Sequence, residues 1–195
     1  MARWQPARAD VLGEYAREIL EVHPRGRIVV GLDGIEDPAG SAPSGREAFA
    51  TDLAAAVEAE GVAALAIPMG RFAAEPRAKD PQRFFDERTF RSEVLDPYRK
   101  GALAGASAER AVLVVSGPLL HFGALAGVWH TSAWLQLSRA EEVERDAARV
   151  PGFDEAAWSA LVDLAFRRLD ARRLANATFD IDDPEHPRRR FEDAC

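Results

Sequence analysis

Cysteine is nearly absent from this 195-residue chain, because Cys195, its last residue, is the only one. A single cysteine excludes an intramolecular disulfide and a cysteine-rich metal centre, and it is typical of a reducing compartment. Apolar runs of membrane-spanning length are missing as well, and the N-terminal segment lacks the apolar core of a signal peptide. We therefore expect a cytoplasmic protein that does not enter a membrane.

Positive charge is in short supply too. The chain has 25 Lys and Arg against 32 Asp and Glu, a formal net charge of -7 and a pI of about 5.2. An acidic chain is repelled by a phosphate backbone, so nucleic acid is not an expected partner. What is present, 47% hydrophobic and 29% charged residues, is enough for a globular core. Without repeats or low-complexity linkers, residues 1–195 are expected to form one domain.

Strand-like and helix-like patterns alternate along the chain. Continuous apolar segments predict buried strands at 27–32, 62–67, 110–116, 132–137 and 177–181. Helical spacing of apolar residues predicts helices at 8–22, 48–60, 84–98, 141–149 and 154–175. The first helix would lie in an N-terminal extension, residues 1–26, and the third would be interrupted at Pro97. This alternation predicts an α/β fold with a mainly parallel sheet covered on both faces.

A glycine-rich loop follows the first strand. It has the strand, G-x-x-x-x-G-K-S/T, helix order of a phosphate-binding loop, in which backbone N–H groups and the helix N-terminus hold phosphate. The candidate anion-binding or nucleotide-binding residues are Gly40, Ser44, Gly45, Arg46 and Glu47. Arg46 replaces the lysine with a forked cation, and Glu47 replaces the hydroxyl that would hold magnesium. An ordinary strand-to-helix loop is the alternative interpretation.

Taken in order, these segments resemble the uridine kinase-like branch of the P-loop nucleoside and nucleotide kinases. The resemblance rests on RIVVGLDG, DPQRFFDERTFRSEVLDPYRKG, AVLVVSGPLL, HTSAWLQLSRAEEVERDAARV and ATFDIDDPEHPRRRF. It implies a three-layer α/β/α P-loop NTPase fold with a central, mainly parallel sheet, whose carboxyl edge faces a nucleotide and an acceptor. It also implies an ATP-dependent phosphotransferase that uses an alcohol acceptor, ATP and Mg²⁺.

Carboxylates are missing at two positions where the resembled kinases use them. Their second strand runs into an acidic motif that accepts the substrate hydroxyl proton, where this chain has Gly70-Arg71-Phe72. Their third strand ends in an acidic residue that helps to organise magnesium, where this chain has Ser116. Neither glycine nor a guanidinium can act as a base, and serine is a poor ligand for Mg²⁺. We therefore expect no ordinary kinase turnover.

Other residues at the family's positions are retained. Arg145 and Arg149 lie four residues apart, on one face of a predicted helix. The resemblance places these arginines in a lid, residues 138–153, and places Asp182 in a loop that flanks an adenine. A solvated helix face with acidic neighbours and a proline-containing turn explain the same residues without any ligand.

Three functions remain open. The first is ATP-dependent phosphoryl transfer to a nucleoside-like or small hydroxylated substrate, which would need ATP and Mg²⁺. The second is a pseudoenzyme that binds a small molecule. The third is a repurposed enzyme, with Asp33, Arg71 and Ser116 as catalytic residues converging at the carboxyl ends of the strands. The first is disfavoured because phosphoryl transfer depends on positioning and charge stabilisation, and several charged groups are lost together.

We expect few cofactors, metals or partners. No cofactor is certain, and no metal site is expected, because His121 and His130 lack a spaced Cys or Glu partner. A small-molecule ligand or substrate is the expected partner. A homodimer, the commonest closed assembly, would cover apolar surface near the tryptophans.

Overall fold

The computed structural model describes residues 6–34, 45–72, 85–136 and 170–191. Its strands form a six-stranded sheet in the order β2-β3-β1-β4-β5-β6. Neighbouring strands are parallel, except that β6 runs antiparallel to β5. The strands are β1 (Arg27–Asp33), β2 (Ala63–Pro68), β3 (Ala111–Ser116), β4 (Thr131–Gln136), β5 (Ala177–Asp180) and β6 (Arg188–Arg190).

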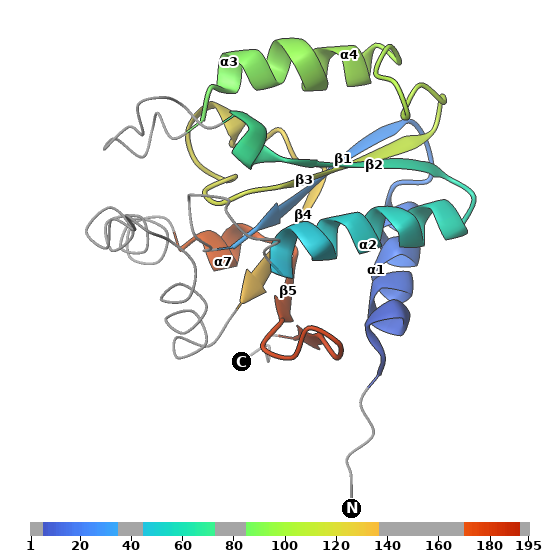
Figure 1. Cartoon of the computed structure of the whole chain (residues 1–195), viewed down its shortest axis with the longest axis vertical. Helices are drawn as coiled ribbons and strands as arrows, with labels where there is room; N and C mark the ends of the chain where they lie inside the picture. Colours follow the sequence, from blue (N-terminus) through green and yellow to red (C-terminus); the bar gives the residue numbers. More distant parts are fainter. Residues whose placement is uncertain (1–5, 35–44, 73–84, 137–169, 192–195) are drawn as a thin grey trace, which may run out of the picture.

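Helices cover both faces of this sheet, as Figure 1 shows. One face carries α1 and α2, and the other carries α3 and α4. The helices are α1 (Arg8–Val22), α2 (Gly45–Ala59), α3 (Glu87–Phe90), α4 (Asp96–Arg99) and α7 (Ala171–Leu174). The predicted three-layer α/β/α arrangement with a mainly parallel sheet is confirmed. In the described ranges, no helix combines the length and apolar character that crossing a bilayer requires.

Strand positions were predicted to within one residue, and the differences lie elsewhere. Helix α2 begins at Gly45 rather than at residue 48, because its first turn is polar and carries no apolar spacing. Strand β6 was not predicted, since three consecutive arginines have no strand pattern. The segment 137–169, which holds the predicted helix 141–149 and most of 154–175, lies outside the described residues.

The predicted interruption at Pro97 is wrong. Helices α3 and α4 join through a π-helical turn, Arg91–Leu95, in which the Asp96 N–H donates to Arg91 O, five residues back. The next residue is Pro97, which has no backbone N–H and so needs no acceptor in the helix. A π turn changes the bonding pattern locally, so the helix accommodates the proline and continues to Arg99.

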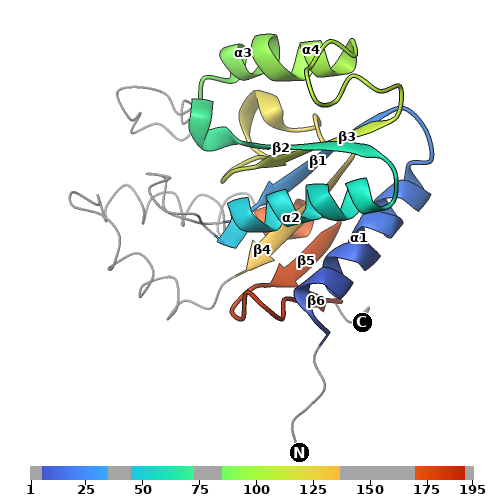
Figure 2. The same ribbon diagram turned by 45° about the vertical axis from the view of Figure 1, so that its right-hand side comes forward.

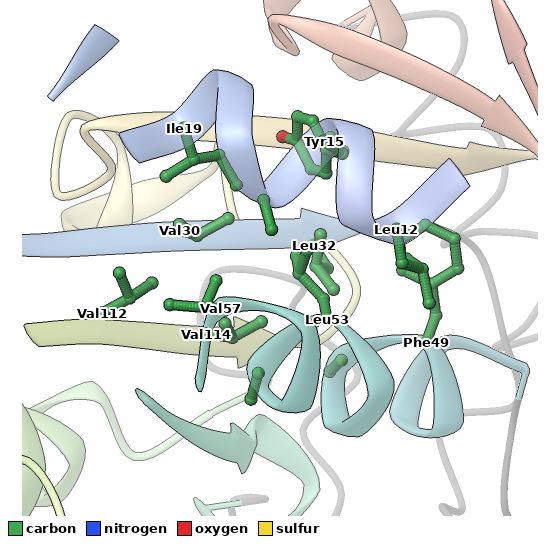
Figure 3. Packing of buried hydrophobic residues seen from close by; sticks show 14 of the residues in the cluster. Leu12, Tyr15, Ile19, Val30, Leu32, Phe49, Leu53, Val57, Val112 and Val114 are labelled. Atoms are coloured by element: carbon green, nitrogen blue, oxygen red, sulfur yellow. The ribbon is translucent and has the colours of Figure 1, made fainter. Parts of the chain in front are cut away.

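The larger core cluster lies between the sheet and the α1–α2 layer. Figure 3 shows side chains from both helices meeting those of β1 and β3. The labelled residues are Leu12, Tyr15, Ile19, Val30, Leu32, Phe49, Leu53, Val57, Val112 and Val114. Because side chains alternate along a strand, Val29 and Asp33 of β1 leave the sheet on the opposite, α3–α4 face. This alternation decides where the candidate site residues lie.

Candidate functional site

Two of the predicted catalytic residues, Asp33 and Ser116, stand at the carboxyl edge of the central strands. Strand β1 lies between β3 and β4, with Leu32 in register with Ser116 and Asp33 in register with Trp134. From β1 the chain crosses to β2 on one side of the sheet, and from β3 it crosses to β4 on the other side. Open α/β sheets bind ligands at such a switch point. The candidate crevice is therefore at the ends of β1 and β3.

Asp33 is almost fully buried, at 1% exposure. Its Oδ1 accepts the Gly34 N–H at 2.8 Å, and its Oδ2 accepts the Leu120 N–H at 2.9 Å. The same Oδ2 lies 3.1 Å from His121 Nδ1. These contacts fill three of the roughly four acceptor positions of a carboxylate. Asp33 therefore joins the start of the glycine loop to the turn that follows β3.

His121 extends this contact to a hydroxyl. Its Nε2 lies 2.9 Å from Ser132 Oγ, and the Ser132 N–H donates to Asn176 Oδ1 at 2.9 Å. With the imidazole proton on Nδ1, His121 donates to Asp33 and accepts from Ser132, the carboxylate–imidazole–hydroxyl order of serine hydrolases. Ser132 is 2% exposed inside β4, so its hydroxyl orients the ring and does not face a ligand.

The sequence did not reveal this network. His121 was considered only as a metal ligand with His130, and its real partners come from β1 and β4. An aspartate at the end of one strand and a histidine in the turn after a neighbouring parallel strand form a usable signal, because parallel strands end at the same edge of the sheet. The contribution of Ser132 has no such signal, since it lies within a strand.

The turn that carries His121 is strained and held from two sides. Leu119 has a φ of 58°, an uncommon conformation for a branched side chain. Trp129 Nε1 donates to Leu120 O at 2.7 Å, while its ring lies on Gly31. A Cβ at Gly31 would stand 2.9 Å from Trp129 Cδ2, so this close approach requires glycine. Asp33 and Trp129 together fix the turn against β1.

Only part of the glycine loop is described, since Gly40 and Ser44 lie outside the described residues. Gly45, Arg46 and Glu47 form the first turn of α2. Arg46 is buried, at 5% exposure, and its Nη1 donates to Gly34 O at 2.5 Å. The guanidinium therefore connects the two ends of the loop. Its charge adds to the positive end of the α2 dipole, which favours an anion there.

The three predicted catalytic residues occupy different surroundings. Ser116 follows Val112 and Val114 on the face covered by α1 and α2, opposite to the Asp33 side chain. Its Oγ is buried and has no hydrogen-bond partner in the described part of the chain. Arg71 is exposed in the short helix after β2. Within the described ranges, no hydrogen bond or ion pair joins these three side chains to one another.

Of the residues retained at the family's positions, Asp182 lies within the described residues. Asp182 follows β5, and its N–H donates to Asp180 Oδ1 at 3.2 Å. Arg145 and Arg149, with the predicted lid 138–153, lie outside the described residues. Asp182 is therefore placed in the expected turn after β5, whereas the lid stays a prediction.

His130 has a structural contact of its own. Its Nδ1 accepts the Val29 N–H at 3.0 Å, and its ring centroid lies 5.9 Å from that of His23. Partial burial lowers the pKa of His130, and the neighbouring His23 and Arg99 lower it further. Among the described residues, no group of three or more His, Cys, Asp or Glu is placed to hold a metal ion.

Known proteins resemble this chain in structure more than in sequence. No protein-family model and no curated protein matches it. A "possible uridine kinase" from Bacillus stearothermophilus superposes with a TM-score of 0.60 at 13% identity, over 89% of this chain and 97% of the other. A "putative fructose transport system kinase" from Silicibacter sp. TM1040 gives a TM-score of 0.53 at 26% identity, over 77% and 93%.

The chain has the uridine kinase-like P-loop fold. The resemblance predicted from its sequence motifs is thereby confirmed. Arg46 contacts Gly34 at the start of the glycine loop. Ser116 lies on the face of the sheet that α1 and α2 cover, whereas the Asp33 side chain and His121 lie on the other face.

Proposed function

We propose that this chain is a small-molecule-binding protein of uridine kinase-like fold without ordinary ATP-dependent kinase turnover. The observation that carries the proposal is the end of β3, where Ser116 stands in register with Leu32 of β1. That position adjoins the glycine loop, and it presents a buried hydroxyl in place of a carboxylate. After β2, the exposed Arg71 likewise supplies no base.

Magnesium and ATP, which the fold implies, do not fit these donors. Mg²⁺ prefers carboxylate oxygens in octahedral geometry, and Ser116 offers only a neutral oxygen. Glu47, in the first turn of α2, adds a negative charge near the helix N-terminus, which disfavours a triphosphate there. No phosphoryl-transfer step is therefore assigned to these residues.

A smaller anionic group fits better than a triphosphate. The N-terminus of α2 and the Arg46 guanidinium supply positive charge, and the Ser116 hydroxyl lies buried on the same face of the sheet. One carboxylate or single phosphate would use these donors without bringing the charge of a polyphosphate to Glu47. The proposed ligand is a small molecule that carries one such group.

A repurposed enzyme is the second candidate, favoured by the Asp33–His121 contact. His121 Nε2 lies 2.9 Å from Ser132 Oγ, which in turn lies 3.4 Å from Asn176 Oδ1. An imidazole held between a carboxylate and a hydroxyl is an arrangement that enzymes use in general acid or base catalysis. This adds His121 to the candidates Asp33, Arg71 and Ser116.

Ligand screening separates the two candidates. Thermal shift against a panel of small carboxylates and phosphate monoesters should find a stabilising ligand, and Arg46→Ala should remove the shift. Any cofactor-free conversion of that ligand would favour the enzyme, in which case His121→Gln should stop turnover while ligand affinity persists. Stabilisation by magnesium-ATP with ATP consumption would replace both candidates with a phosphotransferase. Homodimer formation also stays a proposal, which analytical ultracentrifugation tests.

A further inference from the structure

A cavity lies away from the glycine loop, at the edge of the sheet. Its volume is about 270 Å³, and it is bounded by the N-terminal half of α1, by β5 and by β6 with the residues around it. Figure 2 shows β6 beside the start of α1. This cavity shares no lining residue with the crevice at the ends of β1 and β3. It therefore belongs to a different site.

Aromatic side chains form much of its wall. Tyr15 and Phe179 are buried, with ring centroids 5.0 Å apart, while Phe191 is 78% exposed at the rim. The Arg189 guanidinium lies 5.2 Å from the Phe191 centroid and 5.8 Å from that of Tyr15. A cavity of about 150 Å³ already holds a benzene molecule. The observed volume accommodates an aromatic ring with several further atoms.

Two side chains of opposite charge line this cavity. Glu14 of α1 and Arg188 of β6 are both exposed and both line it. In the described part of the chain, neither side chain has a hydrogen bond or an ion pair. Arg189 differs, because its guanidinium is bonded to Glu18, which raises the pKa of Arg189; the nearby charge of Glu14 raises that pKa further. Glu14 and Arg188 are thus available for a ligand that carries both signs of charge.

We propose that this cavity binds a free α-amino acid with an aromatic side chain. The ring would lie against Tyr15, Phe179 and Phe191, where aromatic contacts and the adjacent guanidinium favour it. The α-carboxylate would pair with Arg188 and the α-ammonium with Glu14. Apolar walls with a few placed polar groups are the usual composition of a small-molecule site. The site is independent of the function proposed for the crevice.

The direct test is isothermal titration calorimetry of the full chain with L-phenylalanine. We expect saturable one-site binding with a dissociation constant of about 1 mM or tighter, the range for a ligand of this size. 3-Phenylpropanoate, which lacks the ammonium, and phenethylamine, which lacks the carboxylate, should each bind about tenfold more weakly. No saturation by L-phenylalanine up to about 10 mM overturns the proposal.

Variants locate the site. Arg188→Ala should weaken L-phenylalanine about tenfold and abolish its advantage over phenethylamine, and Glu14→Gln should abolish its advantage over 3-phenylpropanoate. Arg173→Ala, which removes an exposed arginine outside the cavity, is the matched control and should change nothing. Arg46→Ala should also leave this binding unchanged, so that failure here and failure of the crevice proposal are distinguishable. Equal binding by Arg188→Ala and the parent chain contradicts the assignment.

Discussion

Asp33 and His121, 88 residues apart in sequence, meet with Oδ2 and Nδ1 at 3.1 Å. The contact connects the last residue of β1 to the turn after β3, and Ser132 extends it to β4. A side chain that the sequence marks as a free catalytic carboxylate is thus engaged by three donors of the protein. Its first role is to hold the edge of the sheet together, on which both candidate functions depend.

Replacing Asp33 by alanine should lower the free energy of unfolding by about 2–5 kcal/mol, because two buried N–H groups and an imidazole lose their acceptor. Urea denaturation measures the change. Asp52→Ala is the control: Asp52 is a half-exposed partner of Arg8, and its loss should cost no more than about 1 kcal/mol. Equal stability of Asp33→Ala and the parent would contradict the network.

Replacing Gly31 by alanine should destabilise the protein by about 1–3 kcal/mol, because the new Cβ would stand 2.9 Å from the Trp129 ring. The cost should shrink in a Trp129→Ala background, with a coupling of about 0.5–3 kcal/mol in a double-mutant cycle. Chemical denaturation of the four proteins measures this coupling. Additive effects would mean that the ring does not rest on β1.

Acidification should destabilise the protein through His130. The folded-state pKa of His130 lies below its ordinary value of 6.5, so the unfolded chain binds the extra proton. The stability contributed by neutral His130 is therefore complete above pH 6.5 and is lost as pH falls through the folded-state pKa. Protonation of Nδ1 also removes the acceptor for the Val29 N–H.

Melting temperatures between about pH 8 and pH 5 measure this loss. His130→Asn offers a non-titrating acceptor at the same place, so its melting temperature should fall less over this range. His186→Asn, at an exposed histidine elsewhere, should retain the fall. A His130→Asn protein with the same pH dependence as the parent would exclude His130 as its source.

Much of the fold was predictable, because a parallel sheet buried on both faces produces continuous apolar strands such as Val112–Val115. The strand before the glycine loop and the helix after it were predicted too, whereas residues 35–44 of the loop lie outside the described residues. Other features depend on contacts that sequence spacing does not encode. The π turn that admits Pro97 and the pairing of β6 with β5 are of this kind.

The candidate site was predictable as a location more than as a set of contacts. Asp33 and Ser116 stand at adjacent strand ends, as expected for parallel strands. Their side chains leave the sheet on opposite faces. Ser116 is in register with Leu32 and shares its face, whereas Asp33, the next residue along β1, points to the other face. Because Asp33 is one residue beyond the partner of Ser116, the two side chains that we expected to converge are separated by the sheet. Asp33 contacts His121 instead.

Repairing the loop tests whether only charges were lost. Arg46→Lys with Glu47→Ser restores the P-loop residues at the start of α2, and nucleotide affinity should rise about tenfold or more. Turnover should stay absent, because Gly70-Arg71, directly after β2, still supplies no base. Calorimetry and an ATP-consumption assay measure the two quantities. Unchanged affinity would mean that the loop has a shape other than that of a phosphate-binding loop.

Magnesium-ATP binding to the unmodified chain tests the central claim most directly. Because Glu47 adds negative charge in the first turn of α2, calorimetry should give a dissociation constant weaker than about 1 mM, or no binding. A parallel ³¹P NMR time course with small hydroxylated acceptors should show no ADP. Micromolar binding together with phosphoryl transfer would contradict the account and make this uridine kinase-like chain an active kinase.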